Sequence, residues 1–212
     1  MSFYERRILP RLIDFACRTE SITRQRQKLI PFAQGVVLEI GFGSGLNLPF
    51  YDKTRVSRLL GVEPSEELRE MSRRNADDLL PLELIGLSGE AIPLHDTSVD
   101  TVVSTYTLCT IPDVESALRE IRRVLKPDGV LLFSEHGRAP DPGVCRWQDR
   151  VNPLWRRLAG GCNLNRDVPG LLHAAGFKLD RLEQGYLPGP RLMTFNSMGT
   201  ARPGCTSAVR FG

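Results

Sequence analysis

Residues 36–45 read Val36-Val37-Leu38-Glu39-Ile40-Gly41-Phe42-Gly43-Ser44-Gly45. A short apolar run with β-branched residues that ends at glycines is typical of a buried parallel strand. Glycines directly after such a strand allow a tight turn and the close approach of a ligand to the backbone. A dinucleotide-binding GxGxxG loop would have its third glycine at Leu46. The spacing found here, with Glu39 before the first glycine, instead favours a ligand that lacks a pyrophosphate and carries a cationic group.

Strand and helix patterns alternate beyond this loop. This alternation predicts an α/β fold, a doubly wound, mostly parallel sheet with helices on both faces. Two C-terminal strands are expected to form an antiparallel hairpin at one edge and to complete a seven-stranded sheet. Residues 139–166 are expected to be irregular with short helices, and residues 127–129 to form a turn. The predicted strands are 36–40, 57–62, 82–87, 99–104, 130–133, 177–184 and 191–199.

The N-terminal residues 4–30 have a helical pattern with an apolar face, and Pro10 is expected to divide two helices. Three interpretations stay open for this segment: a lid over a ligand, a basic amphipathic helix on an anionic membrane surface, and a plain packing helix. The expected organisation is a helical lid over 1–35, one domain over 36–202, and a tail over 203–212.

Composition excludes several classes of protein. The 212 residues carry 28 basic and 25 acidic side chains, a net charge of only +3, which argues against a nucleic-acid partner. The five cysteines include no CxxC pair, so neither a disulfide framework nor a metal site is indicated. Because no apolar run approaches 18 residues and no leader is recognisable, a cytoplasmic protein without a transmembrane segment is expected, as a monomer or a homodimer.

An acidic residue, Glu63, ends the second predicted strand, 20 residues after Gly43. A carboxylate at this distance from a glycine loop can accept hydrogen bonds from both hydroxyls of a ribose. Pro64 and Ser65 already provide a helix start, so Glu63 is not needed for that purpose. The loop and the acid together predict a site for a nucleoside-containing ligand.

Three motifs resemble those of class I S-adenosylmethionine-dependent methyltransferases. They are residues 37–45, residues 88–100, and residues 120–129, in the order and spacing of that family. Residues 107–110, 135–137 and 161–166 further resemble a small methyltransferase-like subfamily that includes thiol S-methyltransferases. The resemblance implies S-adenosyl-L-methionine as cofactor, S-adenosyl-L-homocysteine as product, and a small-molecule acceptor.

The resemblance also implies roles for single residues. The glycines of the loop would pass under the methionine part, Glu39 would orient its amino group, and Glu63 would hold the ribose. Ser88 stands where many members have Asp, which leaves one hydrogen-bond acceptor for the adenine. The family often has Cys at the position of Phe42. The full predicted set is Glu39, Gly41, Phe42, Gly43, Gly45, Asn47, Glu63, Pro64, Ser88, Gly89, Glu90, Thr105 and Tyr106.

On the acceptor side, His136 follows the fifth predicted strand and is the candidate base or substrate-orienting residue. Tyr4, Cys109, Asn165 and Arg166 are predicted around the acceptor pocket, and no metal is expected. The acceptor itself is open between a thiol, a phospholipid, and another amine or oxygen nucleophile. Two alternatives from other classes are a nicotinamide-dependent oxidoreductase and a non-catalytic protein that binds S-adenosylmethionine.

Overall fold

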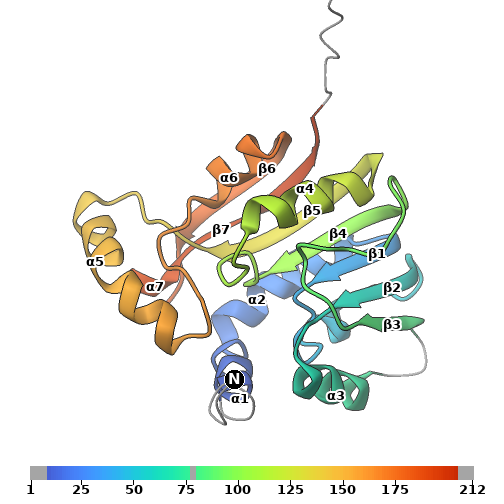
Figure 1. Cartoon of the computed structure of the whole chain (residues 1–212), viewed down its shortest axis with the longest axis horizontal. Helices are drawn as coiled ribbons and strands as arrows, with labels where there is room; N and C mark the ends of the chain where they lie inside the picture. The colour runs from blue at the N-terminus through green and yellow to red at the C-terminus, as the bar shows by residue number, and fades with distance from the viewer. Residues whose placement is uncertain (1–8, 77–79, 205–212) are drawn as a thin grey trace, which may run out of the picture.

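The computed structural model describes residues 9–76 and 80–204, which form one seven-stranded sheet with helices on both faces (Figure 1). The strand order is β3-β2-β1-β4-β5-β7-β6, and β7 runs antiparallel to both of its neighbours. The predicted doubly wound, mostly parallel sheet with an antiparallel edge is confirmed. The strands are β1 (Gly35–Ile40), β2 (Val56–Val62), β3 (Leu82–Ile85), β4 (Val99–Thr105), β5 (Leu125–His136), β6 (Phe177–Tyr186) and β7 (Phe195–Pro203).

Helices α3, α4 and α6 begin at a side chain that caps them, namely Ser65, Asp113 and Asp167. The Asp113 side chain, for example, accepts a hydrogen bond from the Ser116 backbone N–H at the start of the fourth helix, 2.9 Å away. None of the described helices has the length and apolar character needed to cross a membrane. They are α1 (Leu9–Ala16), α2 (Glu20–Leu29), α3 (Glu66–Asn75), α4 (Val114–Val124), α5 (Pro142–Leu158), α6 (Val168–Ala174) and α7 (Arg191–Thr194), with two 3₁₀ turns, η2 (Ile30–Phe32) and η3 (Leu48–Phe50).

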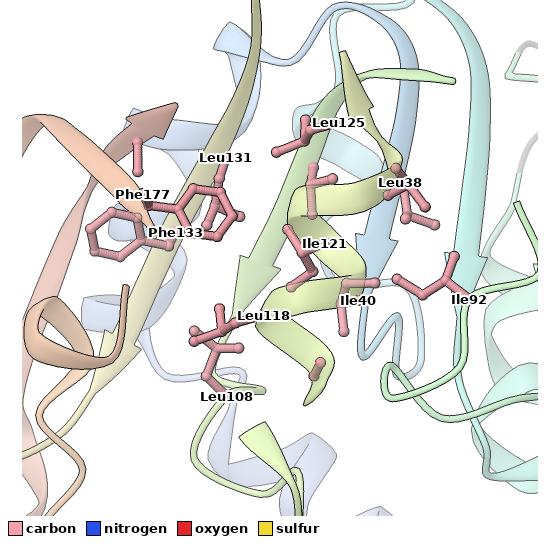
Figure 2. Close-up of a cluster of buried hydrophobic side chains, with 14 of the residues drawn as sticks. Leu38, Ile40, Ile92, Leu108, Leu118, Ile121, Leu125, Leu131, Phe133 and Phe177 are labelled. Atoms are coloured by element: carbon pink, nitrogen blue, oxygen red, sulfur yellow. The ribbon is translucent and has the colours of Figure 1, made fainter. Parts of the chain in front are cut away.

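Two apolar clusters hold the layers together, one on each face of the sheet. Figure 2 shows the larger cluster, in which Ile121 of α4 packs toward Leu38 of β1 and Phe133 of β5. On the opposite face, Leu29 at the end of α2 packs in a cluster with Val37 of β1. Successive side chains of β1 therefore alternate between the two faces, as a strand buried on both sides requires.

The order of the strands determines where a ligand can bind. Strand β1 pairs in parallel with β2 on one side and with β4 on the other. The strand order therefore reverses between β1 and β4, and the sheet extends outward from these two strands in both directions. Loops that follow the carboxyl ends of β1 and β4 leave toward opposite faces and open a crevice between them. The glycine loop after β1 lies at this switch point.

Pro10 lies near the start of α1, as expected for a proline in a first turn, and the short helix predicted before it lies outside the described residues. The predicted helical segment is interrupted once more, at residues 17–19 between α1 and α2. Residues 139–166 contain the 17-residue helix α5, which is longer than the short helices predicted in this otherwise irregular stretch. This helix holds Pro142 in its first turn, where no N–H is needed, and tolerates Pro153 in its interior.

Two strand predictions also need correction. Residues 191–194 form the short helix α7, so β7 starts only at Phe195 and continues to Pro203. The turn expected at 127–129 lies inside β5, which begins at Leu125 and pairs with β4 across an irregular register between Val99 and Thr101. Residues 126–129 have no partner on β4 between the paired residues Leu125 and Val130, so the predicted turn residues interrupt the pairing within β5.

Candidate functional site

The glycine loop turns sharply away from the end of β1. Gly41, Gly43 and Gly45 all have positive φ angles, of 68°, 57° and 83°. Gly41 cannot be replaced by a residue with a side chain for two reasons. Its positive φ would strain such a residue, and the Cβ would lie 2.2 Å from the Thr107 hydroxyl oxygen. A Cβ at position 43 would meet only the Gly41 carbonyl oxygen, at 3.9 Å, although the positive φ would still strain it. The backbone of Gly43 is therefore left accessible to a ligand.

A cavity of about 530 Å³ opens above this loop, within the size range of cofactor sites. It is bounded by the carboxyl ends of β1, β2, β3 and β4, as the fold predicts. Most of the residues predicted to bind the cofactor line it: Glu39, Gly41, Phe42, Gly43, Asn47, Glu63, Pro64, Ser88, Gly89, Thr105 and Tyr106. Gly45 and Glu90 do not. A Cβ on Gly45 would meet the Leu48 side chain, and Glu90 accepts a hydrogen bond from the Asp113 backbone N–H at 2.7 Å.

The Glu63 side chain is held in place by backbone N–H groups of two loops. One carboxylate oxygen accepts from the backbone N–H of Gly43 and the other from that of Ser65, both at 2.9 Å. Burial raises the pKa of Glu63, although these two hydrogen bonds act to lower it. Each oxygen retains a free lone pair toward the cavity, so the carboxylate can still accept two hydroxyl groups.

Glu39 lies deeper, 2% exposed, in a polar network under the loop. Its carboxylate accepts hydrogen bonds from the Asn47 amide at 2.9 Å and from the Tyr51 hydroxyl at 2.6 Å. The same Asn47 amide group donates to the Thr105 hydroxyl at 3.0 Å. Burial raises the pKa of Glu39 to about 7. The oxygen of the Asn47 amide has no hydrogen-bond partner within the part of the chain that the structure describes, which leaves it to a ligand.

The buried Glu39 makes stability depend on pH in a definite direction. Because its pKa rises from 4.5 to about 7 on folding, its contribution is full below pH 4.5 and is lost as the pH rises toward 7. We expect Glu39→Gln to flatten this decline, by roughly 2–4 °C in melting temperature for each kcal/mol regained. Thermal unfolding of both proteins between pH 4.5 and 8 measures it. The exposed Glu83→Gln variant is the control, and equal pH slopes for Glu39→Gln and the parent would contradict the expectation.

The two departures from the family pattern have local explanations. The Phe42 ring turns into the core and packs against Gly61 of β2, where a Cβ would lie 2.6 Å from the ring. Its backbone, not its side chain, is thus free to face the cavity. The Ser88 hydroxyl donates to the Glu90 carboxylate at 2.8 Å. An acid at position 88 would be repelled by the Glu90 carboxylate, whereas Ser88 can donate a hydrogen bond to it.

The sequence did not single out Arg26, which also lines this cavity. Its side chain is 4% exposed, and one terminal nitrogen donates to the Cys17 carbonyl oxygen at 2.6 Å. Its guanidinium carbon lies 5.8 Å from the centre of the Tyr106 ring, a cation–π distance. Within residues 9–76 and 80–204, Arg26 has no carboxylate in ion-pair range, and its Nε lacks a hydrogen-bond partner. A buried cation of this kind suits an anionic group of a ligand.

A second cavity of about 370 Å³ adjoins the first. The two share Ile13, Cys17, Tyr106 and Thr110 in their walls. Most of the second wall is apolar, and α1, α5 and the segment around α7 contribute to it. The sheet's end contributes Asn196, whose amide oxygen has no hydrogen-bond partner among the described residues. This cavity is therefore a candidate acceptor pocket beside a candidate cofactor pocket.

Tyr106 stands between the two cavities in an unusual conformation. It is one of two non-glycine residues in the described chain with a positive φ, here 56°. Such a backbone costs on the order of 1–3 kcal/mol and persists only where its surroundings impose it. Its backbone N–H donates to the Ser134 carbonyl oxygen at 2.9 Å, which ties it to β5. The fold thus holds an aromatic ring at the junction of the cavities.

Cys109, His136 and Cys162 meet at the wall of the second cavity. The Cys162 sulfur lies 3.2 Å from His136 Nε2, and the donor atoms of all three residues lie within 4.8 Å of one another. The Cys109 thiol, together with the imidazole, lowers the pKa of Cys162 well below its usual range. Burial alone would lower the pKa of His136, but its contact with Cys162 raises it. Cys162 was noted only as part of a motif, because nothing local in the sequence connects it with His136.

The remaining predicted acceptor residues lie elsewhere. Arg166 donates to the carbonyl oxygens of Leu108 and Ile111, so it fixes the loop that carries Cys109. Asn165 donates to an Asp149 carboxylate oxygen at 2.8 Å near the surface. Neither belongs to the walls of the two cavities. Tyr4 lies outside the described residues.

Comparisons with known proteins identify a family for the sequence and similar solved structures for the fold. Residues 38–133 match the model of a family described as a methyltransferase domain. Human thiol S-methyltransferase TMT1B is 32% identical over 168 residues, which cover 74% of this chain and 68% of that protein. Phosphatidylethanolamine N-methyltransferase of Cereibacter sphaeroides is 30% identical over 126 residues, or 58% and 61% of the two chains. The solved structure of an S-adenosylmethionine-dependent methyltransferase from Mesorhizobium loti has a TM-score of 0.63 at 20% identity and covers 87% of this chain and 98% of its own.

Proposed function

The chain belongs to the S-adenosylmethionine-dependent methyltransferases, and we propose that it methylates the sulfur of a small apolar thiol. Membership of this family replaces the nicotinamide-dependent alternative. The observation that carries the proposal is the second cavity, which is apolar, adjoins the cofactor cavity at Tyr106, and has a Cys–His cluster in its wall.

The first cavity fits S-adenosylmethionine part by part. We assign the ribose hydroxyls to Glu63 and the adenine to the region of Ser88 and Gly89. The unpartnered Asn47 oxygen would accept a hydrogen bond from the cationic amino group, and Arg26 would pair with the carboxylate. Two of these assignments use polar atoms that have no hydrogen-bond partner among the described residues, the Asn47 amide oxygen and the Arg26 Nε.

The reaction needs mainly alignment. S-adenosylmethionine supplies a methyl group that is already electrophilic, because it is attached to a positively charged sulfur. The protein has to hold the acceptor in line with that methyl group, which can be worth about 7–11 kcal/mol. Walls of both cavities meet at Tyr106 and Thr110, so the reacting atoms would meet there. His136 and Cys162 line the second cavity, where the acceptor sulfur would lose its proton.

Helix α1 is the proposed lid. Ile13 lines both cavities, and Asp14 of the same helix accepts a hydrogen bond from the Ser44 hydroxyl in the glycine loop. Leu12 and Phe15, on the outer side of α1, are exposed. The contacts with the loop favour the lid over the membrane-surface interpretation of the N-terminal segment, since they tie the helix to the cofactor cavity.

Transfer of labelled methyl groups to a matched acceptor series tests the thiol proposal. We expect turnover with small alkyl thiols and at least tenfold less with the corresponding alcohols and amines, because a thiol forms its anion far more readily than an alcohol does and the apolar cavity disfavours a charged ammonium group. Vesicles that contain phosphatidylethanolamine are the second arm, since a relative carries that activity in its name. Methylation of the lipid amine with no thiol turnover would replace the proposal by the phospholipid alternative.

A further inference from the structure

We propose that Cys109, His136 and Cys162 bind one Zn²⁺ ion, and that this ion holds the sulfur of the acceptor as a thiolate. The metal site stands on the arrangement of its three residues, whereas its role in catalysis rests on the thiol acceptor proposed above. The site lies in the wall of the second cavity and uses no residue assigned to the cofactor.

The distances suit a mononuclear metal site. The Cys109 Sγ, His136 Nε2 and Cys162 Sγ atoms lie within 4.8 Å of one another, and the Cys162–His136 pair is 3.2 Å apart. Zinc bonds of about 2.3 Å to sulfur and 2.0–2.1 Å to nitrogen separate tetrahedral ligands by about 3.3–3.8 Å. Side-chain movements of about one ångström would therefore close the three atoms around an ion.

The three ligands are held in position by the backbone. His136 ends β5 and is paired in register with Asn196 of β7. The backbone N–H and the side-chain amide of Asn163 both donate to the Cys109 carbonyl oxygen, at 2.9 and 2.8 Å. The loop that carries Cys162 is thereby tied to the loop that carries Cys109. A site assembled from three distant segments has no spacing motif, which explains why the sequence did not indicate it.

The three donor atoms favour zinc and leave one of its four coordination positions open. Two thiolates and one imidazole are typical zinc ligands, and three protein ligands with an open fourth position are typical of catalytic rather than structural zinc. Two thiolates also neutralise the charge of the ion, which suits its apolar surroundings. No fourth histidine, cysteine or acid joins this cluster in the described residues. Because the cluster lines the second cavity, the fourth position is left to the acceptor.

The chemical step balances without a further reactant. As the acceptor thiol binds Zn²⁺, its proton passes to solvent. A lone pair of the bound sulfur then forms the bond to the methyl carbon, and the electrons of the breaking carbon–sulfur bond stay on the departing cofactor sulfur. The products are a thioether, S-adenosyl-L-homocysteine and one proton. A thioether binds zinc more weakly than a thiolate does, so product release is favoured.

Metal binding is tested on the full chain, freed of metal with a chelator, reduced, and titrated with Zn²⁺ and with Co²⁺ as a spectroscopic probe. We expect about one ion per chain and a thiolate-to-cobalt charge-transfer absorption, as two cysteine ligands require. Cys162→Ser and His136→Gln should lower affinity for the ion at least tenfold. Cys145→Ser, a cysteine on α5 outside the cluster, should bind like the parent. Circular dichroism checks that each variant is folded.

Failure of the parent protein to bind either ion, or binding that Cys162→Ser and Cys145→Ser leave equally intact, would overturn the metal site. The catalytic role has a separate readout. We expect zinc to keep the rate of thiol methylation flat down to about pH 7, and the metal-free protein to lose activity as the pH falls below the acceptor thiol's own pKa. Equal rates and pH profiles with and without zinc would remove that role and leave the thiol proposal intact. Zinc binding without turnover of any thiol would overturn the proposed function and leave the metal site intact.

Discussion

Glu63→Ala is expected to weaken binding of S-adenosyl-L-homocysteine about a hundredfold, and at least tenfold. The carboxylate is assigned to both ribose hydroxyls, and each hydrogen bond to a charged acceptor contributes about 1.5–3 kcal/mol. The variant also leaves the backbone N–H groups of Gly43 and Ser65 without their acceptor, which loosens the glycine loop. Isothermal titration calorimetry measures the change directly.

The ribose assignment and a purely structural role of Glu63 predict different results. If Glu63 binds the ribose, the parent should prefer adenosine over 2′,3′-dideoxyadenosine, and Glu63→Ala should lose that preference. If Glu63 only anchors the loop, both affinities should fall together. Glu70→Ala on the exposed side of α3 is the charge-matched control and should bind like the parent. Cofactor affinity of Glu63→Ala within threefold of the parent would end the assignment.

Most residues that line the candidate cofactor cavity could be predicted because they lie where the chain itself requires them. Glycines after β1 and an acid after β2 occupy the carboxyl ends of adjacent strands, and the strand order alone brings these ends together. The same logic placed Tyr106 after β4. What the sequence could not provide was the direction of each side chain, such as that of Phe42, which enters the core.

The acceptor half is built from elements that carry no such periodic signal. Helix α5 contains two prolines, which hid a continuous helix in a stretch that was predicted to be irregular with short helices. Its position depends on long-range bonds, among them those of the fully buried Gln148 side chain to the carbonyl oxygens of Gly137 and Leu164. Contacts of this kind are tertiary, so the meeting of Cys162 with His136 is visible only in the folded chain.

Arg26 illustrates a signal that was present but weak. It belongs to an arginine-rich helix in which Arg24 and Lys28 are exposed, so its charge alone did not distinguish it. Its spacing did, because Ile22, Arg26 and Leu29 fall on one helical face. A cation on the apolar face of a helix beside a predicted ligand site is a better indicator than the overall count of arginines.

Arg26→Met is expected to have opposite effects on binding and on stability. Truncating one partner of a buried charge pair costs about 2–5 kcal/mol, so affinity for S-adenosyl-L-homocysteine should fall at least about thirtyfold. Without ligand, however, the buried guanidinium has no carboxylate within ion-pair range among the described residues, and an apolar side chain of similar length avoids its desolvation. The melting temperature of the ligand-free variant should therefore equal or exceed that of the parent.

Binding of 5′-methylthioadenosine separates a carboxylate contact from general damage to the cavity. This compound has the adenine, the ribose and the sulfur but no amino acid, so Arg26→Met should bind it as the parent does. Arg26→Lys keeps the positive charge and should recover part of the lost affinity for S-adenosyl-L-homocysteine. If both ligands lose affinity equally in Arg26→Met, the arginine supports the cavity wall through its bond to the Cys17 carbonyl oxygen, and another group must bind the carboxylate. Selective loss of the carboxylate-bearing ligand would explain why α2 carries a buried cation at all.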